Sequence, residues 1–404
     1  MAGYQPNPIA QDAYSRFMAD MYDERQIIAV QTVFQQFFGR PEYGGRTYYS
    51  PDAAAVDIDI IRGTDLTAAL VPRGTVTRPL GGTQRNAISQ RYSSFSRSFP
   101  LVEEESDFEA TQLLRRMAGE PSYGGMTQSD RLRSFAIDEH QEHIRRVVRL
   151  DEILAGISLR TGFMPAILGT VDPDLTYDFR RLGTHTYAAP AVWTNAATDI
   201  LTQWDTAWAL INRDGKCNMD MVFIGGTAVP GIFNNTAIRA LLDNRRIEIG
   251  LVSNGQTVPA SMQRFVDAGA TCLGYLTTTR GHRVWMFTYD GTYTNAAGAV
   301  VNYMPLTEAF YACSTARCDR YFGPNERMPL GSAERQWYQE TFGFSMAGPN
   351  MPGRISGSNI IVPESFYFDA YPSSDRKRVT LRTQQAPIYV PTQTDAFVLA
   401  TAVA

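Results

Sequence analysis

The stretch YDGTYTNAAGAVVNYMPLTEAFY, residues Tyr289–Tyr311, is the part of this chain that best indicates its fold. YDGTY predicts an edge strand, a polar turn follows it, and NYMP leads into another strand. Asp290-Gly291 is a favourable turn pair, because both residue types tolerate the backbone angles of tight turns. The stretch closes a region, residues 196–305, in which helix and strand patterns alternate, and we expect a compact α+β unit there.

The composition is that of a folded chain with many turns. Of the 404 residues, 44% are hydrophobic and 19% are charged, which suffices for two or three ordinary domains or for one elongated body with arms. The 32 glycines and 22 prolines are spread along the chain, which favours turns and strands over a long disordered tail. Residues 1–10 lack the pattern of an export signal, and no window predicts a membrane span.

The charge pattern does not favour tight binding of nucleic acid. The formal net charge is -4, whereas proteins that hold nucleic acid by charge normally carry a basic stripe. Of the 37 basic residues only Lys216 and Lys377 are lysines, which leaves 35 arginines. Arginine suits interfaces because it forms bidentate pairs with carboxylates, although a codon bias toward arginine explains most of the excess.

The N-terminal part predicts a helix followed by a long extended loop. Residues 27–38 carry an apolar stripe with roughly helical spacing, and Phe38-Gly39-Arg40-Pro41 would end the helix. In residues 56–60 valine and isoleucine alternate with aspartate, which predicts a strand, and residues 94–99 predict its partner. Between them, residues 72–91 contain few large apolar side chains and predict the tip of the loop. Such a two-stranded arm is marginally stable alone and needs a neighbour to lie on.

The strongest helix pattern covers residues 127–162. Thr127 and Asp130 form a capping-box pattern at its start. At 1.5 Å per residue the helix would be roughly 50 Å long, which suits the spine of a flat subunit. The predicted inward face carries Ile137, Ile144, Val147, Val148, Leu154 and Ile157, and the predicted solvent face carries Glu139, Glu142, Arg145, Arg146, Arg149 and Glu152.

The rest of the chain predicts shorter elements. These are short strands and turns over 163–195, a helix over 196–211, a buried strand over 219–224, a helix that ends near 245–246, strands around 247–252, 272–277, 283–289 and 300–304, a turn at Asn254-Gly255, and further strands over 378–402.

No motif in the sequence predicts a catalytic, cofactor-binding or metal-binding residue. Gly225-Gly226 follows a buried strand, but GGTAVPG lacks the Gly-Lys-Ser/Thr of a phosphate loop and the GxGxxG spacing of a dinucleotide fold, so a tight turn is the better interpretation. No nucleophile elbow is present. An enzyme whose active site leaves no local motif stays a third, weaker interpretation.

Histidine and cysteine spacing does not predict a metal site either. His140 and His143 are spaced differently from an HExxH pair, and only His185 and His282 remain to complete a ligand set. We interpret the first two as part of a solvated, charged helix face. The four cysteines show no zinc-knuckle pairing, and we expect structural free thiols at Cys217, Cys272, Cys313 and Cys318.

Several segments, in order over most of the chain, resemble the lambda-type major capsid protein family of tailed bacteriophages. No single motif is diagnostic, and it is their order that carries the resemblance. The segments are VFQQFFGRPEY (33–43), DIDIIRGTDLTAALVPRGT (57–75), the arginine-rich helix (about 127–160), Asp178-Phe179 with Trp193 and the Trp204/Trp208 helix, YDGTYTN and NYMP, Ala316-Arg317 with Tyr321-Phe322-Gly323-Pro324, and LRTQQAPIYVPTQTDAFVLATAVA (381–404).

The resemblance implies the α+β Hong Kong phage-type major capsid fold, and it implies no catalytic residues. The implied parts are an N-terminal arm (1–45), an extended β-hairpin loop (46–110), a spine helix with the peripheral domain (111–195), an axial domain (196–310), and a return to the peripheral domain with the C-terminal strands (311–404).

The implied function is assembly. Copies would form hexamers and pentamers of an icosahedral shell around double-stranded DNA, in the virion, after assembly in the cytoplasm of a host bacterium. Implied partners are further copies, a scaffold, a portal, decoration proteins and non-specifically contacted DNA, without a membrane or a cofactor. The alternative is the shell protein of a cellular encapsulin-type nanocompartment, which has the same fold but encloses cargo protein.

One departure from the wider fold carries a separate prediction. Some relatives lock the shell with an isopeptide bond between asparagine and a lysine of the extended loop. This chain has no lysine between Met1 and Asp214, so we expect a shell without such crosslinks.

Overall fold

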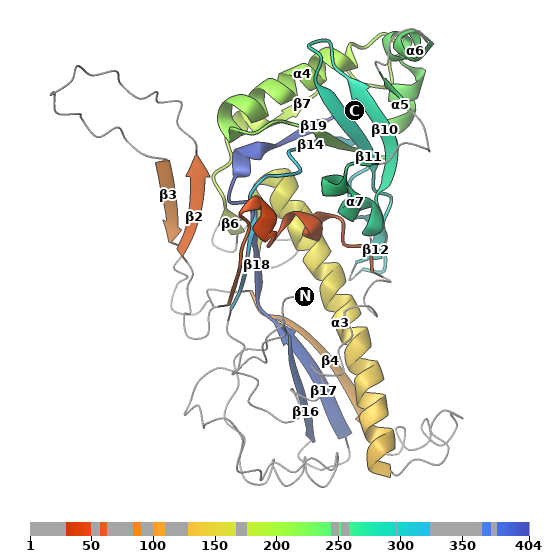
Figure 1. Ribbon diagram of the computed structural model, residues 1–404. Coiled ribbons are helices and arrows are strands. Elements are labelled where there is room, and N and C mark those ends of the chain that lie inside the picture. Colours follow the sequence, from red (N-terminus) through yellow and green to blue (C-terminus); the bar gives the residue numbers. More distant parts are fainter. Residues whose placement is uncertain are drawn as a thin grey trace, which may run out of the picture.

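The protein is an elongated α+β molecule organised along one long helix (Figure 1). In the computed structural model, the described residues are 30–49, 57–62, 84–89, 100–109, 128–166, 176–243, 250–251, 258–295, 297–323, 366–372 and 378–403. Helix α3 (Gln128–Thr161) has 34 residues and is therefore roughly 50 Å long. This confirms the predicted spine helix. One half of α3 lies along a small sheet, and the other half enters the main core (Figure 1).

The main core is built around a seven-stranded mixed sheet. Its order is β7-β19-β14-β8-β11-β10-β9, with parallel pairs only at β7–β19 and β8–β11. The C-terminal strand thus lies beside a strand from residues 308–312, so the predicted 196–305 unit needs later chain to complete its sheet. The strands are β7 (Thr186–Ala188), β8 (Met221–Ile224), β9 (Gly250–Leu251), β10 (Thr271–Thr277), β11 (Arg283–Thr288), β14 (Glu308–Ala312) and β19 (Phe397–Thr401).

Both faces of this sheet are covered by other parts of the chain. Alternate residues of a strand point to opposite faces, so each strand contributes side chains to both cores. In β8, Met221 and Phe223 belong to the core that contains α3, while Val222 and Ile224 belong to the core on the other face. This explains why β8 is apolar throughout. The second face is covered by α4 (Ile200–Leu210), α5 (Val229–Asn234) and α6 (Thr236–Asp243), whereas α7 (Ala260–Asp267) packs on the α3 side.

The N-terminal described residues lie in the first of these cores. Phe34 contacts Phe223, Tyr289 and Phe310 with ring centroids 5.5–6.1 Å apart, and Phe37 lies 4.7 Å from Phe265. The helix predicted over 27–38 is wrong where it can be checked, since only one turn of 3-10 helix forms, at Phe34–Phe37. The aromatic side chains have core partners on several sides, and this packing overrides helical spacing. Residues 27–29 lie outside the described residues.

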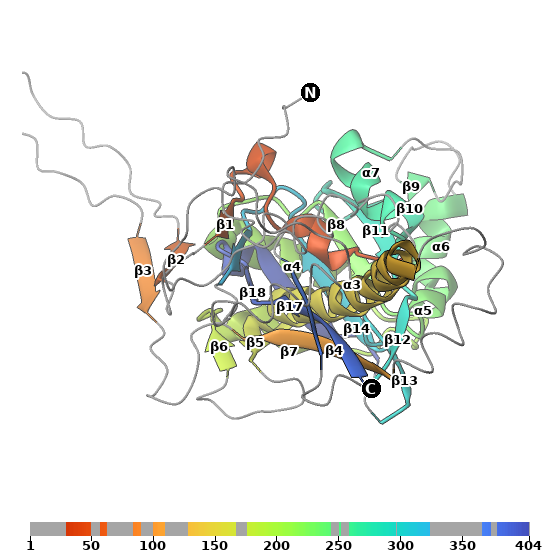
Figure 2. The same ribbon diagram turned by 90° about the horizontal axis from the view of Figure 1, so that it is seen from below.

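A second, three-stranded sheet lies along the first half of α3 (Figure 2). Its antiparallel order is β16 (Tyr367–Pro372), β17 (Arg378–Gln385) and β4 (Val102–Glu109). Phe108 of β4 meets Phe135 of α3 edge to face at 4.8 Å. The strands predicted after residue 378 are therefore confirmed.

The remaining strands form small sheets. The predicted hairpin in Tyr289–Tyr311 is confirmed as β12 (Thr292–Thr294) paired with β13 (Val300–Asn302). The strand predicted over 56–60 is confirmed as β2 (Asp57–Arg62), but its partner is β3 (Gln84–Ser89). The predicted partner, residues 94–99, lies outside the described residues. The other strands are β1 (Thr47–Tyr49), β5 (Phe163–Pro165), β6 (Thr176–Asp178), β15 (Asp319–Phe322) and β18 (Pro387–Val390).

Two predictions about the faces of α3 need correction. Ile144, Val147, Val148 and Leu154 are buried as expected, and Arg146 and Arg149 are exposed. Glu152, however, is fully buried, because the second half of the helix is covered by both the N-terminal segment and the main sheet. His140 and His143 are also buried, since the three-stranded sheet covers the face that we interpreted as solvated.

Candidate assembly elements

The turn after β8 lets the backbone at Gly225 pack closely against the backbone at Leu306. A Cβ atom on Gly225 would lie 2.3 Å from the carbonyl oxygen of Leu306, so the close approach of two backbones requires glycine. The Gly225 N–H donates to the carbonyl of Glu308 at 2.9 Å, and Thr227 N–H donates to that of Leu306 at 3.1 Å. Because these amides are already used, they do not form the open cradle that a phosphate needs.

The histidines are distributed over three places. His140 and His143 lie together under the three-stranded sheet. His185 is buried, with Nε2 at 3.1 Å from Asp214 and Nδ1 at 3.0 Å from the Phe397 carbonyl, and His282 stacks on Trp208 at 3.7 Å. Within the described residues, no group of three His, Cys, Asp or Glu side chains could hold a metal ion. The four cysteines are free, as predicted.

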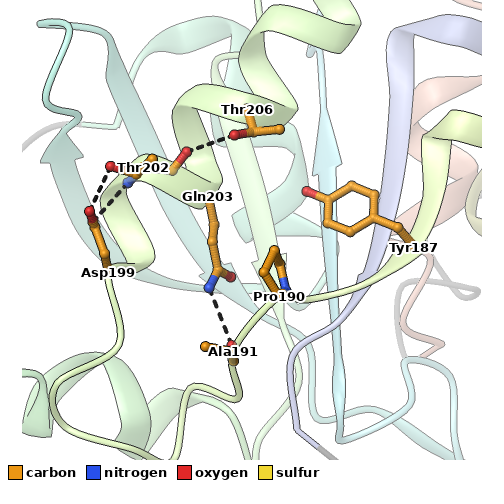
Figure 3. Close-up of a pocket in the computed structure, with 7 residues that line it drawn as sticks. All are labelled: Tyr187, Pro190, Ala191, Asp199, Thr202, Gln203 and Thr206. Atoms are coloured by element: carbon orange, nitrogen blue, oxygen red, sulfur yellow. Dashed lines mark hydrogen bonds between the residues drawn. The ribbon is translucent and has the colours of Figure 1, made fainter.

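A small pocket of about 270 Å³ lies between the start of α4 and the segment after β7 (Figure 3). Pockets for drug-sized ligands are typically about 300–1,000 Å³. Its polar groups bond mainly to one another or to nearby backbone: Asp199 accepts from the backbone N–H of Thr202 at 3.0 Å, and Gln203 donates to the Ala191 carbonyl at 3.2 Å. The Tyr187 hydroxyl is buried without a partner among the described residues, and burial raises its pKa to about 12. This arrangement contains neither a nucleophile–base pair nor a paired acid and base.

The β2–β3 hairpin stands at one side of the molecule (Figure 1). Ile58 and Ile60 of β2 are buried and belong to the main hydrophobic cluster, and β2 contacts the turn Thr394–Ala396. The hairpin is thus anchored to the body by apolar contacts of β2, and among the described residues no third strand joins its ladder. A two-stranded ribbon of this kind gains stability when another surface covers it.

The face of the three-stranded sheet that points away from α3 is lined with charge. The exposed positions of β4 are all acidic, namely Glu103, Glu105, Asp107 and Glu109. Arg382 of β17 bridges Glu103 at 3.1 Å and Asp369 at 3.0 Å. Asp369 is buried and Arg382 is only partly exposed, so Arg382 helps to join the three strands of this sheet, while the remaining exposed carboxylates of β4 leave the face acidic.

A few large apolar side chains are exposed in the described residues. Val300 on β13 is 70% exposed, and Phe163, Leu306 and Val192 are exposed by 37–45%. Three of them lie around the seven-stranded sheet, on its hairpin and connecting segments. Single exposed apolar residues are common, and these four are simply the apolar positions available for contacts.

Two adjacent carboxyl groups are buried where α3 meets the N-terminal segment. Burial raises the pKa of Asp151 to about 7 and that of Glu152 to about 8, and the mutual repulsion of the two groups adds to the rise at Glu152. Perturbed carboxyls can mark an active site, but Glu152 bonds to the backbone of Phe34 and Gln35, and Asp151 to Tyr389 and Gln385. These bonds connect α3 to two other parts of the core and give both residues a structural role.

The described residues thus form an elongated subunit with a spine helix and a two-stranded hairpin, and no catalytic group is assembled among them. The chain belongs to the family of phage major capsid protein E, whose family model matches residues 34–324. The predicted family and fold are thus confirmed: the fold is the Hong Kong phage capsid fold.

Solved structures agree with this fold. The chain is similar to a putative capsid protein of a prophage of Escherichia coli CFT073, with a TM-score of 0.56, 14% identity and 97% of each chain covered. It is also similar to a phage-related protein of Bordetella bronchiseptica RB50, with a TM-score of 0.43, 8% identity and 98% of each chain covered. A third match is an encapsulin complex from Synechococcus elongatus PCC 7942, with a TM-score of 0.38, 8% identity and 88% and 85% coverage.

Only the first of these TM-scores exceeds 0.5, so the other two support no conclusion about this chain. A search of curated proteins found no sequence match. The family nevertheless defines the role: the protein is a major capsid protein, a structural component of the virion that associates with further copies of itself. No described helix combines the length and apolar character needed to cross a membrane.

Proposed function

We propose that this capsid protein assembles as hexamers and pentamers into an icosahedral shell that encloses double-stranded DNA. The match of the family model over residues 34–324 is the observation that supports this proposal. The formal charge of -4 is consistent with a shell that tolerates DNA by non-specific contact without gripping it. The role is structural, without catalysis.

Within this shell, the seven-stranded sheet with α4–α7 would form the axial domain at the capsomer centre. Helix α3 and the sheet β16-β17-β4 would form the peripheral domain, and the β2–β3 hairpin the base of the extended loop. The half-covered hairpin supports this division, because a ribbon without a core of its own gains its remaining contacts from a neighbouring copy. Many modest contacts of this kind, repeated by symmetry, give a stable closed shell.

The further partners follow from what a shell of this kind requires. A scaffold would direct curvature, a portal would occupy one vertex, and decoration proteins would reinforce a shell without covalent crosslinks. Assembly would take place in the cytoplasm of the host bacterium. Each of these partners is part of the proposal and rests on the family membership.

Negative-stain electron microscopy of the purified protein, with and without a candidate scaffold, tests the proposal. Closed shells, or rings of five and six subunits, are the expected result. A monomer under both conditions would overturn it. The contents of shells purified from the native source then distinguish a virus shell from a nanocompartment. DNA extracted from the particles supports the virus shell, whereas one abundant cargo enzyme, identified by mass spectrometry, without DNA supports the nanocompartment.

A further inference from the structure

The buried pair His140 and His143 joins α3 to the three-stranded sheet through a continuous series of hydrogen bonds. The Nδ1 atoms of His140 and His143 lie 2.9 and 3.2 Å from the same hydroxyl, Thr383 Oγ1 on β17. His143 Nε2 lies 2.7 Å from Ser106 Oγ on β4, and that hydroxyl donates to Glu139 Oε1 at 3.1 Å. Thr383 and His143 are fully buried, and His140 is 2% exposed.

The number of hydrogen atoms available in this series determines which atom donates in each hydrogen bond. Ser106 has one hydroxyl proton and gives it to the carboxylate of Glu139, so it must accept from the Nε2–H of His143. A neutral His143 then has a bare Nδ1, which accepts the hydroxyl proton of Thr383. The Thr383 oxygen accepts in turn from the Nδ1–H of His140. Both rings are neutral, and they are opposite tautomers.

A second arrangement uses the same four contacts with one more proton. If His143 carries both ring protons, it donates to Ser106 and to Thr383. Thr383 then donates to Nδ1 of His140, whose own proton sits on Nε2. The two arrangements differ by one added proton at His140 Nε2, one proton passed from His140 Nδ1 to Thr383, and one passed from Thr383 to His143 Nδ1.

We infer that His140, Thr383, His143 and Ser106 form a proton relay that takes up a single proton as a unit, with the charge placed on His143, and that this relay makes the joint between α3 and the sheet sensitive to acid. A second proton on His140 is opposed because the two ring centroids are only 5.7 Å apart. His140 also lies edge-on to Phe368 of β16, with ring centroids 5.1 Å apart.

The charged groups around the pair favour His143 as the carrier. Glu139, Glu142 and Arg146 of α3 and Glu104 of β4 surround it, and Glu104 is itself paired with Arg146 at 3.4 Å. Burial lowers the pKa of both histidines, to about 4 for His143, while Glu104 opposes this fall. The joint therefore stays neutral near pH 7 and changes only on acidification. Below the ordinary histidine pKa, unfolding takes up protons, so the joint weakens as the pH falls toward 4.

The 15N NMR chemical shifts of the imidazole nitrogens report the tautomer of each histidine. The chain has four histidines, so the unassembled full-length protein labelled with 15N-histidine gives four imidazole signal sets. At pH 7, His140 should be the Nδ1–H tautomer and His143 the Nε2–H tautomer. On acidification, His140 should change tautomer at the same midpoint at which His143 becomes an imidazolium. An Nε2–H tautomer of His140 at pH 7, or two separate midpoints, would overturn the inference.

Two substitutions at one position provide a matched test. Thr383→Val removes the shared hydroxyl and should uncouple the two midpoints and release His140 to the Nε2–H tautomer, whereas Thr383→Ser should behave like the unaltered protein. Thr380→Val on the same strand is the control, because its hydroxyl bonds to Asp107 and not to a histidine. Identical spectra of the Thr383→Val and Thr380→Val proteins would contradict the relay, and the measurement on the unaltered chain stands even if Thr383→Val fails to fold.

Discussion

The Glu152 carboxyl group of α3 accepts a hydrogen bond from the backbone N–H of Phe34 at 2.7 Å, in a fully buried position. Its second oxygen accepts from the N–H of Gln35 at 3.1 Å. The two residues are 118 positions apart in the chain. A single side chain of the spine helix thus satisfies two amides of the N-terminal segment at the point where Phe34 enters the aromatic core.

We predict that Glu152→Ala destabilises the subunit by about 2–5 kcal/mol, because each buried donor left unpaired costs about 1–3 kcal/mol. Chemical denaturation of the unassembled protein measures the loss, and hydrogen exchange of residues 30–38 should show the segment opening. Glu142→Ala is the matched control on the same helix. Its ion pairs with Arg145 and Arg146 lie at the surface, with side chains 37–47% exposed, and their loss should cost under about 1 kcal/mol. Equal losses in the two variants would contradict the anchoring role.

The same pair of carboxyls predicts how stability depends on pH. The pKa of Asp151 is raised to about 7 and that of Glu152 to about 8, so the folded state binds protons that the unfolded chain releases above pH 4–5. The free energy of unfolding should therefore fall as the pH rises toward 8, at up to about 1.4 kcal/mol per pH unit for each group. Burial lowers the pKa of His140 and His143, so they contribute a trend of the opposite sign near pH 6.5, where an unfolded histidine is still partly protonated, and little at pH 8.

Glu152→Gln isolates this effect, because the amide does not titrate. Urea midpoints measured at pH 6.5, 7.2 and 8 should fall less steeply with pH in the variant than in the unaltered protein, whatever the offset between them. Parallel curves would show that Glu152 is ionised in the folded state throughout this window.

Backbone contact at Gly225 gives a third prediction. Gly225→Ala should destabilise the protein by about 1–3 kcal/mol, because the added Cβ would lie 2.3–2.5 Å from backbone atoms of Pro305 and Leu306 that cannot move independently. Gly183→Ala is the control, as nothing lies within 4 Å of a Cβ at that position. Thermal unfolding compares the two, and a variant at 225 as stable as the one at 183 would mean that the turn relaxes freely.

The sequence predicted well those elements whose pattern depends on local periodicity. Helix α3, the hairpin β12–β13 and the buried strand β8 all follow from the spacing of apolar residues. It failed where distant contacts decide. Residues 34–37 fit the aromatic core better as a single turn than as a helix, and β2 pairs with residues that the composition had suggested as a loop tip.

The buried polar residues of α3 could not have been predicted from a helical wheel. His140, His143 and Glu152 occupy positions that a single helix would expose, and they are covered because a sheet and the N-terminal segment pack on faces beyond the apolar stripe. Their partners Thr383 and Phe34 lie more than 100 residues away, so no local pattern signals the contact.

The distribution of lysines leads to the last prediction. An isopeptide crosslink from the extended loop requires a lysine amine there, and the chain has none before Lys216. Mature particles boiled in detergent should therefore give one band at 45.0 kDa or below it if the chain is processed, without a ladder of covalent oligomers. The shell must then be held by non-covalent contacts, and particles should dissociate into subunits in denaturant. A ladder that persists after boiling with reductant would show that another residue supplies the crosslink and would contradict the prediction.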